Sequence, residues 1–473
     1  MIDLLAGVRS TLAGETAWVV GGAIRDELLG RATQDYDLAV AGDPRGVARA
    51  VARATGGAAF PLSEAFGAWR VVGPGSAWHV DLVALVAGDL LRDLAARDFT
   101  VNAMARPLAG GEVIDPHGGR GDLAARRLRM VSEAGLAADP LRTMRAVRFA
   151  VELGLELEPA TSAAVATCAD GLAHVAQERV FAELRRVVGA DAAVDGLRLM
   201  EAHGLTRVVL PELHALRGVE QNVFHHLDVH DHTLEVLQAV ILLERDPAAA
   251  GLGEHADAVA AQLAEPLADG LTRGGAMRLA ALLHDAAKPR TRDVTDGGRV
   301  TFIGHDAEGA ALSAAVLRRL KTSERLVDYV AALTRHHLRL GFLVHERPLT
   351  RRAAWRYLRD TAPYEVETTV FTVADRLATR GRNAEPAIAA HLELAREMLG
   401  HALAHRAAGS VAPLLRGDEL MAALEVPPGP EVGRLLAQLE EDRYAGEVST
   451  RAEALERAEQ LVRSAPDRSP GSP

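Results

Sequence analysis

The chain has 473 residues, enough for about two to four domains, and 48% of its residues are hydrophobic, which suffices for packed cores. The formal net charge of −11 does not indicate a general nucleic-acid-binding surface, and a single cysteine, Cys168, excludes a disulfide framework and a cysteine-based zinc site. No run approaches the roughly 18 apolar residues of a membrane span, so we expect a cytoplasmic protein that does not contact membranes.

The first 120 residues alternate strand and helix signals. Gly21 and Gly22 follow the first predicted strand, and glycines let backbone N–H groups approach phosphate oxygens closely. Arg25 lies on the helix that follows, whose N-terminus adds partial positive charge. Pro61 is interpreted as a break between strands. Strands are predicted at Ala17–Val20, Asp35–Val40, Ala68–Val72, Trp78–Leu85 and Glu112–Asp115.

Asp35 and Asp37 are two residues apart on a predicted strand, so their side chains leave the same face and can reach one metal site. Carboxylate oxygens suit Mg²⁺, and two Mg²⁺ ions can bind the attacking and leaving oxygens of a phosphoryl transfer. A lone Gly-Gly or Asp-x-Asp is common in turns. The prediction of a nucleoside triphosphate site therefore depends on the ordered combination.

A second motif contains Arg97, Asp98 and Asn102. Arg97 offers a fixed cation for phosphate, Asp98 can accept a hydrogen bond from a ribose hydroxyl, and Asn102 can donate and accept. Taken alone, this run favours an ordinary helix start with Asp98 as its N-cap.

A third motif places Asp139 and Arg142 on one helix face, with Pro140 in the first turn. Such a pair can imitate a Watson–Crick partner: Arg donates to cytosine N3 and O2, and Asp accepts from the N4 amine. A small shift would serve adenine, whereas uracil would leave buried groups unpaired. The alternative is an ion pair within the helix.

In this order, the motifs resemble the bacterial class II tRNA nucleotidyltransferases, the CCA-adding enzymes and their poly(A) polymerase relatives. The resemblance covers nearly the whole chain. It implies an α+β fold, in which a small polymerase-β-type head with a mixed sheet precedes an all-helical neck, an HD-type body and a tail. It rests on Gly-Gly-x-x-Arg-Asp at 21–26, Asp-x-Asp at 35–37, Arg-Asp-Phe-Thr-x-Asn-Ala at 97–103, Asp-Pro-x-Arg-x-x-Arg-Ala-x-Arg-Phe-Ala at 139–150, and Glu178-Arg179-Val180.

The resemblance also implies a reaction, in which the 3′-hydroxyl of tRNA attacks the α-phosphate of CTP or ATP and releases pyrophosphate without a nucleic-acid template. Asp81 could assist the metals, although a solvated acid at a strand edge is equally plausible. The implied roles are Mg²⁺ binding by Asp35 and Asp37, triphosphate binding by Gly21, Gly22 and Arg25, ribose and phosphate placement by Arg97, Asp98 and Asn102, and base selection by Asp139 and Arg142 with Arg145 and Arg148 nearby.

Two departures from the family pattern concern specificity. Ala138 stands where the family usually has Glu, which leaves open how the base-selecting helix is braced. The segment 82–96 is shorter than in CCA-adding members, which carry a flexible loop there that is implicated in A addition. The short segment resembles members that add only CC. Full CCA addition is the alternative.

The second half of the chain is rich in histidine. His232, His284, Asp285 and Asp375 resemble the ligands of the HD phosphohydrolase superfamily. His305, with His336 or His337, would complete the two-metal form, and Lys288 could meet a substrate phosphate. Imidazoles mixed with carboxylates suit Mn²⁺, Fe²⁺ or Ni²⁺, with Mg²⁺ as a further candidate. The alternatives are an HD fold that only holds tRNA, or a protein that is mainly a phosphatase or 2′,3′-cyclic phosphodiesterase with a relict head.

These patterns divide the chain into five predicted parts, and they do not predict its oligomeric state. The parts are a nucleotidyltransferase head at 1–137, a neck with the base-selecting helix at 138–218, an HD domain at 219–405, a helical tRNA-binding tail at 406–462 and a disordered end at 463–473.

Overall fold

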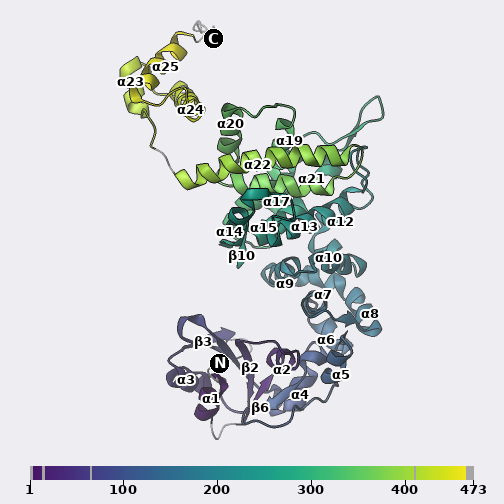
Figure 1. The fold of residues 1–473 in the computed structure, drawn as a ribbon. Coiled ribbons are helices and arrows are strands. Elements are labelled where there is room, and N and C mark those ends of the chain that lie inside the picture. Colours follow the sequence, from purple (N-terminus) through teal and green to yellow (C-terminus); the bar gives the residue numbers. More distant parts are fainter. Residues whose placement is uncertain (1–3, 13–15, 64–66, 410–411, 465–473) are drawn as a thin grey trace, which may run out of the picture. The chain divides into compact units, whose positions relative to one another are not determined.

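The computed structural model describes residues 4–12, 16–63, 67–409 and 412–464 (Figure 1). The chain forms two compact units, Met1–Pro211 and Glu212–Pro473. Most of the predicted disordered end, 465–473, lies outside the described residues. Within the described part of the chain, no helix has the length and apolarity needed to cross a membrane.

A six-stranded mixed sheet forms the centre of the first unit, with the strand order β3-β4-β5-β2-β1-β6. β2 and β5 are parallel, and the other neighbours in the sheet are antiparallel. The mixed sheet of the predicted head is thereby confirmed. The strands are β1 (Ala17–Val20), β2 (Asp35–Val40), β3 (Ala58–Ser63), β4 (Ala68–Val72), β5 (His79–Ala84) and β6 (Ala105–Pro107).

Two details of the strand prediction are wrong. Glu112–Asp115 is not a strand, because only Ile114 forms a bridge, to Ala105. Pro61 does not end a strand but lies inside β3. β3 is the edge of the sheet, and an edge strand tolerates a proline because one side of the strand needs no ladder hydrogen bond.

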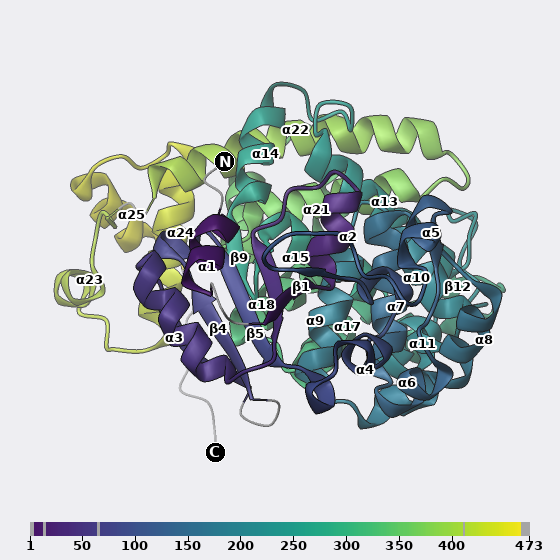
Figure 2. The same ribbon diagram turned by 90° about the horizontal axis from the view of Figure 1, so that it is seen from below.

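The alternation of side chains along the strands separates the two faces of the sheet. Leu38, Val71 and Leu82 are fully buried on the face covered by α3 (Pro44–Thr55). Figure 2 shows α3 beside β4. α1 (Leu4–Thr11) packs against α3. On the opposite face, α4 (Leu90–Ala95) buries Leu94 against Val20 of β1. The same face carries the polar residues Asp35 and Asp37 of β2 and Asp81 of β5.

Short helices link the strands to the helical neck. T-shaped packing of Phe99 and Phe149, with ring centroids 5.8 Å apart, connects the head to α7. α7 packs against α9 and α10. These elements are α2 (Gly22–Leu28), η3 (Thr100–Asn102), α5 (Gly119–Ala124), α6 (Glu133–Ala138), α7 (Leu141–Leu153), α8 (Pro159–Thr167), α9 (Gln177–Gly189), α10 (Ala193–Ala202) and α11 (Leu205–Val209).

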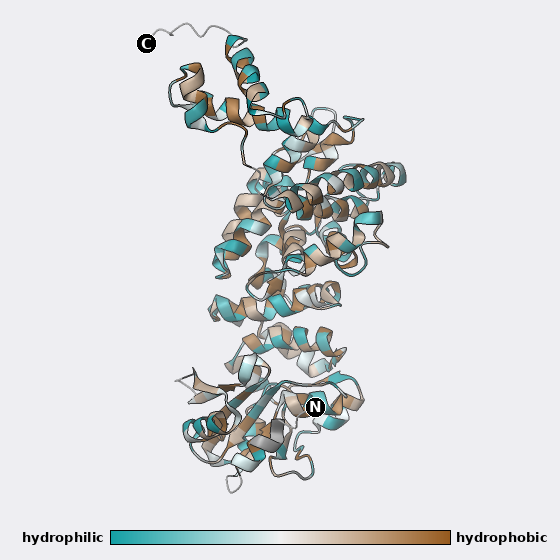
Figure 3. Ribbon diagram, turned by 60° about the vertical axis from the view of Figure 1, so that its left-hand side comes forward, coloured by the Kyte–Doolittle hydropathy of each residue, from teal (hydrophilic) through white to brown (hydrophobic). Residues whose placement is uncertain are grey.

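The second unit is mostly helical, with two small two-stranded sheets at 266–272 and 293–301. α13 packs against α15 and α21, and α17 packs against α18. Figure 3 shows hydrophobic and hydrophilic residues on the same helices, as expected of helices with one buried face. The larger helices of the body are α13 (Val229–Arg245), α14 (Ala256–Ala264), α15 (Arg273–Leu283), α17 (His305–Arg319), α18 (Glu324–His336), α20 (Arg351–Thr361), α21 (Glu365–Ala378) and α22 (Ala384–Ala408).

The tail helices α23 (Gly417–Leu424), α24 (Pro430–Ala445) and α25 (Arg451–Arg463) share a small core of their own. α24 also packs against α20. There, Trp355 stacks on Tyr444 with ring centroids 5.2 Å apart, and Arg352 pairs with the buried carboxylates of Glu441 and Asp442. The tail is therefore fixed to the body by both ring packing and ion pairs.

Candidate active sites

The parallel pairing of β2 with β5 gathers the predicted metal-binding carboxylates. Asp37 lies opposite Asp81, and Asp35 lies opposite His79, on the same face of the sheet. His79 Nδ1 is 3.0 Å from Asp35 Oδ1. Burial raises the pKa of Asp37, and the neighbouring Asp81 and Asp35 raise it further, although Arg97 acts in the opposite direction. Crowded carboxylates of this kind form a donor set that suits Mg²⁺.

Asp81 is held by Arg70. The Nε and Nη2 atoms of Arg70 donate to its two carboxylate oxygens, each over 2.7 Å. The carboxylate of Asp81 therefore belongs to a bidentate ion pair beside Asp35 and Asp37, the predicted metal ligands.

Gly21 forms the turn between β1 and α2. Its backbone has φ 71° and ψ −130°, and a Cβ at this position would lie 2.5 Å from Arg97 Nη1 and 3.4 Å from Asp37 Oδ2. Only glycine fits this turn without displacing those side chains. The turn thus brings backbone, a fixed cation and a carboxylate to one place.

A chain of hydrogen bonds fixes the polar residues next to this turn. Arg25 Nη1 donates to Asn102 Oδ1 over 2.7 Å, and Asn102 Nδ2 donates to Asp98 Oδ1 over 3.1 Å. Arg145 Nε donates to Asp98 Oδ2 over 2.7 Å. Although burial favours the neutral acid, Arg145 and Asn102 hold the pKa of Asp98 below its usual value. Asp98 thus orients two other site residues.

Three arginines surround the ring of Phe149. The guanidinium carbons of Arg25, Arg145 and Arg148 lie 5.2, 5.3 and 4.2 Å from the ring centroid. Arg148 is buried and pairs with Glu183 at 3.2 Å. Burial lowers the pKa of Arg148 to about 10. It therefore supports the site from behind, whereas Arg25 and Arg145 line the cavity.

Asp139 and Arg142 line the same cavity but do not pair with each other among the described contacts. Arg179 Nη2 donates to Asp139 Oδ2 over 3.2 Å. Arg142 Nη2 and Nη1 donate to the backbone oxygens of Ala96 and Arg97 over 2.8 and 3.2 Å. The alternative of an ion pair within the helix is therefore not formed, and both side chains face the cavity.

The cavity in the first unit has a volume of ≈ 490 Å³. Asp93, Phe149 and Arg179 line it without having been predicted as site residues, although Arg179 belongs to the motif Glu178-Arg179-Val180. The cavity is lined by Gly21, Gly22, Arg25, Asp37, Val86, Asp93, Ala96, Arg97, Asp98, Asn102, Asp139, Leu141, Arg142, Arg145, Phe149 and Arg179.

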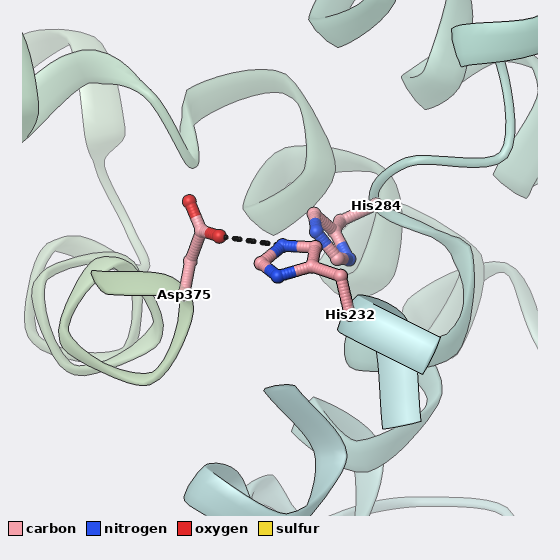
Figure 4. Close-up of side chains that lie close together, drawn as sticks. All are labelled: His232, His284 and Asp375. Carbon is pink, nitrogen blue, oxygen red and sulfur yellow. Dashed lines mark hydrogen bonds and ion pairs between the residues drawn. The ribbon is translucent and has the colours of Figure 1, made fainter. Parts of the chain in front are cut away.

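A second polar cluster lies inside the body. It comprises two groups of residues, and within each group the ligand atoms lie within 4.8 Å of one another. The first group is His232, His284 and Asp375, and the second is Asp285, His305 and His337. Figure 4 shows Asp375 on α21 directed at His232 on α13, with Nε2 and Oδ1 3.1 Å apart, and His284 beside them. His336 belongs to neither group.

Backbone carbonyls orient the histidine rings of this cluster. The Nδ1 atoms of His284, His305 and His337 contact the oxygens of Ala281, Phe302 and Thr334 at 2.9, 2.7 and 2.6 Å. If Nδ1 carries the proton, Nε2 is left as the ligand atom, an arrangement that is usual around metal-binding histidines.

Nε2 of His284 and both carboxylate oxygens of Asp285 are buried at the centre of the cluster. Asp285 Oδ2 lies 3.1 Å from His284 Nε2, and Asp285 Oδ1 lies 3.4 Å from His305 Nε2. The Lys288 ammonium lies 2.6 Å from Asp285 Oδ2. Burial lowers the pKa of His337 to about 4, so this ligand is neutral near pH 7. Buried atoms of this kind need partners, and the donor set fits a pair of metal ions.

An open cavity of ≈ 790 Å³ leads to this cluster. Three side chains on its wall are cationic at neutral pH, namely Lys288, Arg299 and Arg376. His225 also lines the cavity, and burial lowers its pKa to about 3. The wall can therefore accommodate an anionic group next to the metal-ligand set.

Family models match both units. Residues 17–81 and 74–129 match the poly A polymerase head domain, residues 229–380 match the HD domain, and residues 307–458 match a tRNA nucleotidyltransferase domain 2. Fold and sites thus define a nucleotidyltransferase whose catalytic head is joined to an HD body.

Proteins of similar sequence show which family of nucleotidyltransferases the chain belongs to. The A-adding tRNA nucleotidyltransferase of Deinococcus radiodurans is 41% identical, with 93% of this chain and 94% of the relative aligned. The CC-adding tRNA nucleotidyltransferase of Thermus thermophilus is 38% identical, with 93% of this chain and 92% of the relative aligned. The chain belongs to the tRNA nucleotidyltransferase family, and it is an enzyme that transfers nucleotides.

Solved structures share the fold. The Thermotoga maritima CCA-adding enzyme complexed with tRNA is 18% identical, with a TM-score of 0.60 over 97% of this chain and 94% of that chain. The apo form I of a CCA-adding enzyme has a TM-score of 0.64 at 17% identity, over 99% of this chain and 96% of that chain. The predicted architecture of an α/β head and a helical body is thereby confirmed.

Proposed function

We propose that this enzyme adds cytidylates to the 3′ end of tRNA, taking CTP and releasing pyrophosphate. Asp35 and Asp37 would hold Mg²⁺, which supplies charge for the phosphoryl transfer. Arg25 and Arg97 would bind the triphosphate beside the Gly21 turn. Asn102, fixed between Arg25 and Asp98, would place the ribose.

Base selection is assigned to Asp139 and Arg142. Both line the cavity, and the bonds from Arg142 to the carbonyls of Ala96 and Arg97 keep its guanidinium at a fixed position. A fixed donor next to a carboxylate matches the N3 and N4 edge of cytosine, whereas uracil presents the opposite pattern at both atoms. Arg142→Ala should therefore reduce the preference for CTP over UTP by about tenfold or more, measured as the ratio of kcat/KM values.

The proposal of CC addition rests on one observation in the segment 82–96. The end of β5, the turn η2 (Val86–Gly88) and the helix α4 occupy it almost completely. Asp89 caps α4 by accepting from the N–H groups of Leu91 and Arg92. No length is left for the flexible loop that the family resemblance associates with A addition. CTP is therefore the expected substrate, and ATP is not.

Product lengths test this proposal, because relatives of both specificities are similar to the chain. Purified enzyme receives tRNA transcripts that lack CCA, end in the first C, or end in CC, each with CTP, ATP or both. With CTP, we expect two cytidylates on the transcript that lacks CCA and one on the transcript that ends in the first C. The transcript that ends in CC should not be extended. Efficient addition of A to the transcript ending in CC would contradict CC addition, and full CCA addition or A addition would then be the function.

A second candidate function is a metal-dependent phosphohydrolase in the HD body. The buried set of histidines and carboxylates around Asp285 favours it, and so do the cationic residues of the adjoining cavity. The ligands suit Mn²⁺, Fe²⁺ or Ni²⁺, or Mg²⁺. A phosphate ester at an RNA end is the expected substrate class, because the head is proposed to act on the 3′ end of tRNA.

Neighbouring histidines provide a matched test of the metal site. His337 belongs to the cluster and His336 does not. We expect His337→Ala to lose about one metal ion per chain by elemental analysis and to lose phosphatase activity, and His336→Ala to retain both. Equal metal content in the two variants would remove His337 from the ligand set, and a metal-free wild type would leave the body as a tRNA-holding scaffold.

A further inference from the structure

A row of side chains continues from the predicted Mg²⁺ ligands across the open face of the head sheet. Asp37 on β2 lies opposite Asp81 on β5, Asp81 opposite Arg70 on β4, and Arg70 opposite Phe60 on β3. Residues directly opposite on neighbouring strands point to the same face. The row therefore leads from the metal site to the edge of the sheet.

Beyond Asp37, this row lies outside the cavity of the first unit, the proposed nucleotide cavity. Asp37 lines the cavity, whereas Asp81, Arg70 and Phe60 do not. The cavity is formed by the turn after β1 and by residues of α2, α4 and α7, and β1 and β5 flank β2 on opposite sides. Asp37 thus stands between the nucleotide cavity and the row.

The far end of the row offers two binding groups to solvent. Phe60 is 42% exposed, and α3, which packs on β3, covers the other face of the sheet. Arg70 uses Nε and Nη2 for Asp81, while no partner for its Nη1 is found among the described residues, and the side chain is 35% exposed. An aromatic ring and a free guanidinium N–H suit a base and a phosphate.

The geometry of attack at the α-phosphate determines which substrate can bind along this row. In an in-line displacement, the attacking oxygen and the leaving pyrophosphate lie on opposite sides of the α-phosphate. The cations for the triphosphate, Arg25 and Arg97, are on the cavity side of Asp37. The attacking 3′-hydroxyl must then arrive from the side of Asp81, Arg70 and Phe60.

We propose that Phe60 and Arg70 form the subsite for the acceptor end of the RNA, a step that rests on the proposed transfer to tRNA. Phe60 stacks on a base at the 3′ end, and Arg70 Nη1 binds a phosphate of the same strand. Stacking on an aromatic ring accepts any base, which suits an acceptor whose last base changes between the first and second additions. Asp81 is a positioning residue that holds Arg70 in this orientation.

Steady-state kinetics with separate titration of both substrates test the subsite. We expect Phe60→Ala to raise KM for tRNA about tenfold, because the variant loses base stacking on an aromatic side chain, and to leave KM for CTP within about twofold. Phe60→Trp should restore tRNA binding. The matched control is Arg49→Ala, because Arg49 packs over Trp69 on the covered face, 5.7 Å from the ring centroid.

Two readouts separate contact with RNA from a structural effect. Arg70→Gln should reduce the slope of log KM for tRNA against log salt by about 0.7, the contribution of one phosphate contact on a single strand. An acceptor with 5-iodocytidine at its 3′ end should crosslink to the peptide that contains Phe60 on irradiation.

The outcomes are distinguishable. If Phe60→Ala extends tRNA with unchanged KM, or if Arg49→Ala raises that KM equally, the subsite is wrong and the proposed transfer stands. If the wild-type enzyme transfers no cytidylate to tRNA, the proposed function is wrong and the subsite falls with it.

Discussion

At Gly21, the proposed nucleotide cavity leaves no room for a side chain. The turn needs a positive φ, and the guanidinium of Arg97 occupies the space that a Cβ would take. Gly22 is less constrained, because the nearest atom to its Cβ would be Nη2 of Arg25, at the ordinary contact distance of 3.4 Å. The adjacent glycines thus have different roles. Gly21 is required by its backbone conformation and by the contact with Arg97, whereas Gly22 begins α2.

Substitution of the two glycines should separate these roles. In Gly21→Ala, the new methyl group displaces Arg97, and the backbone strain costs about 1–3 kcal/mol. We expect kcat/KM for CTP to fall by at least about tenfold, with Gly22→Ala affected clearly less. Kinetics on both variants, with circular dichroism to confirm folding, check this. Equal losses would show that the space around Gly21 is not what limits the site.

Asp98 shows what the sequence cannot reveal at this scale. Its motif predicts a ribose contact or a helix cap, but the carboxylate is buried and binds Arg145, 47 positions further along the chain. Such a partner depends on how α7 packs on the head, which no local pattern contains. In contrast, Asp35 and Asp37 could be predicted to share a face, because that property follows from strand geometry alone.

The elements of the head were predictable where the chain alternates apolar and polar residues. Strands 17–20, 35–40 and 68–72 agree with the structure to the residue. β3 could not be predicted, since its proline is acceptable only at a sheet edge, and edge position is a property of the whole sheet. Similarly, the sequence could not choose between His336 and His337, because the choice depends on how α18 ends.

The packing of α22 on α21 creates a pH-dependent contribution to stability. His391 on α22 is buried, and its Nε2 lies 3.1 Å from Thr372 Oγ1 on α21. Burial lowers its pKa to about 4, whereas an unfolded histidine titrates near 6.5. Between these values the unfolded chain binds more protons. The free energy of unfolding therefore falls as the pH decreases from about 6.5 to about 4.

His391→Gln should remove this part of the pH dependence while keeping a side chain that can bond to Thr372. The native contribution amounts to at most about 3 kcal/mol across that range. Denaturant titrations of the full chain at pH 7.5, 6, 5 and 4.5, with a chelator present to exclude metal effects, should show a flatter profile for the variant. A variant that loses stability with pH as steeply as the wild type would contradict the assignment to His391.

At the scale of the whole molecule, the two candidate chemistries occur in separate compact units. The nucleotide cavity is lined only by residues of Met1–Pro211, and the metal-ligand cluster lies entirely in Glu212–Pro473. Each cluster is completed by residues of its own unit. The ligands of one site should thus be independent of those of the other.

A reciprocal pair of substitutions tests this independence. Asp37→Asn removes a carboxylate from the head, so we expect cytidylate transfer to fall by at least about a hundredfold, with the metal content of the body unchanged. Asp285→Asn should lower the metal content and leave CTP binding by the head intact, because the ion pairs of Asp285 within the described part of the chain join it to histidines of the cluster and to Lys288. Elemental analysis gives the metal content of each variant, and calorimetric titration gives its affinity for CTP. If either substitution abolishes both properties, the two sites are energetically coupled across the chain, and they must then be treated as one functional system.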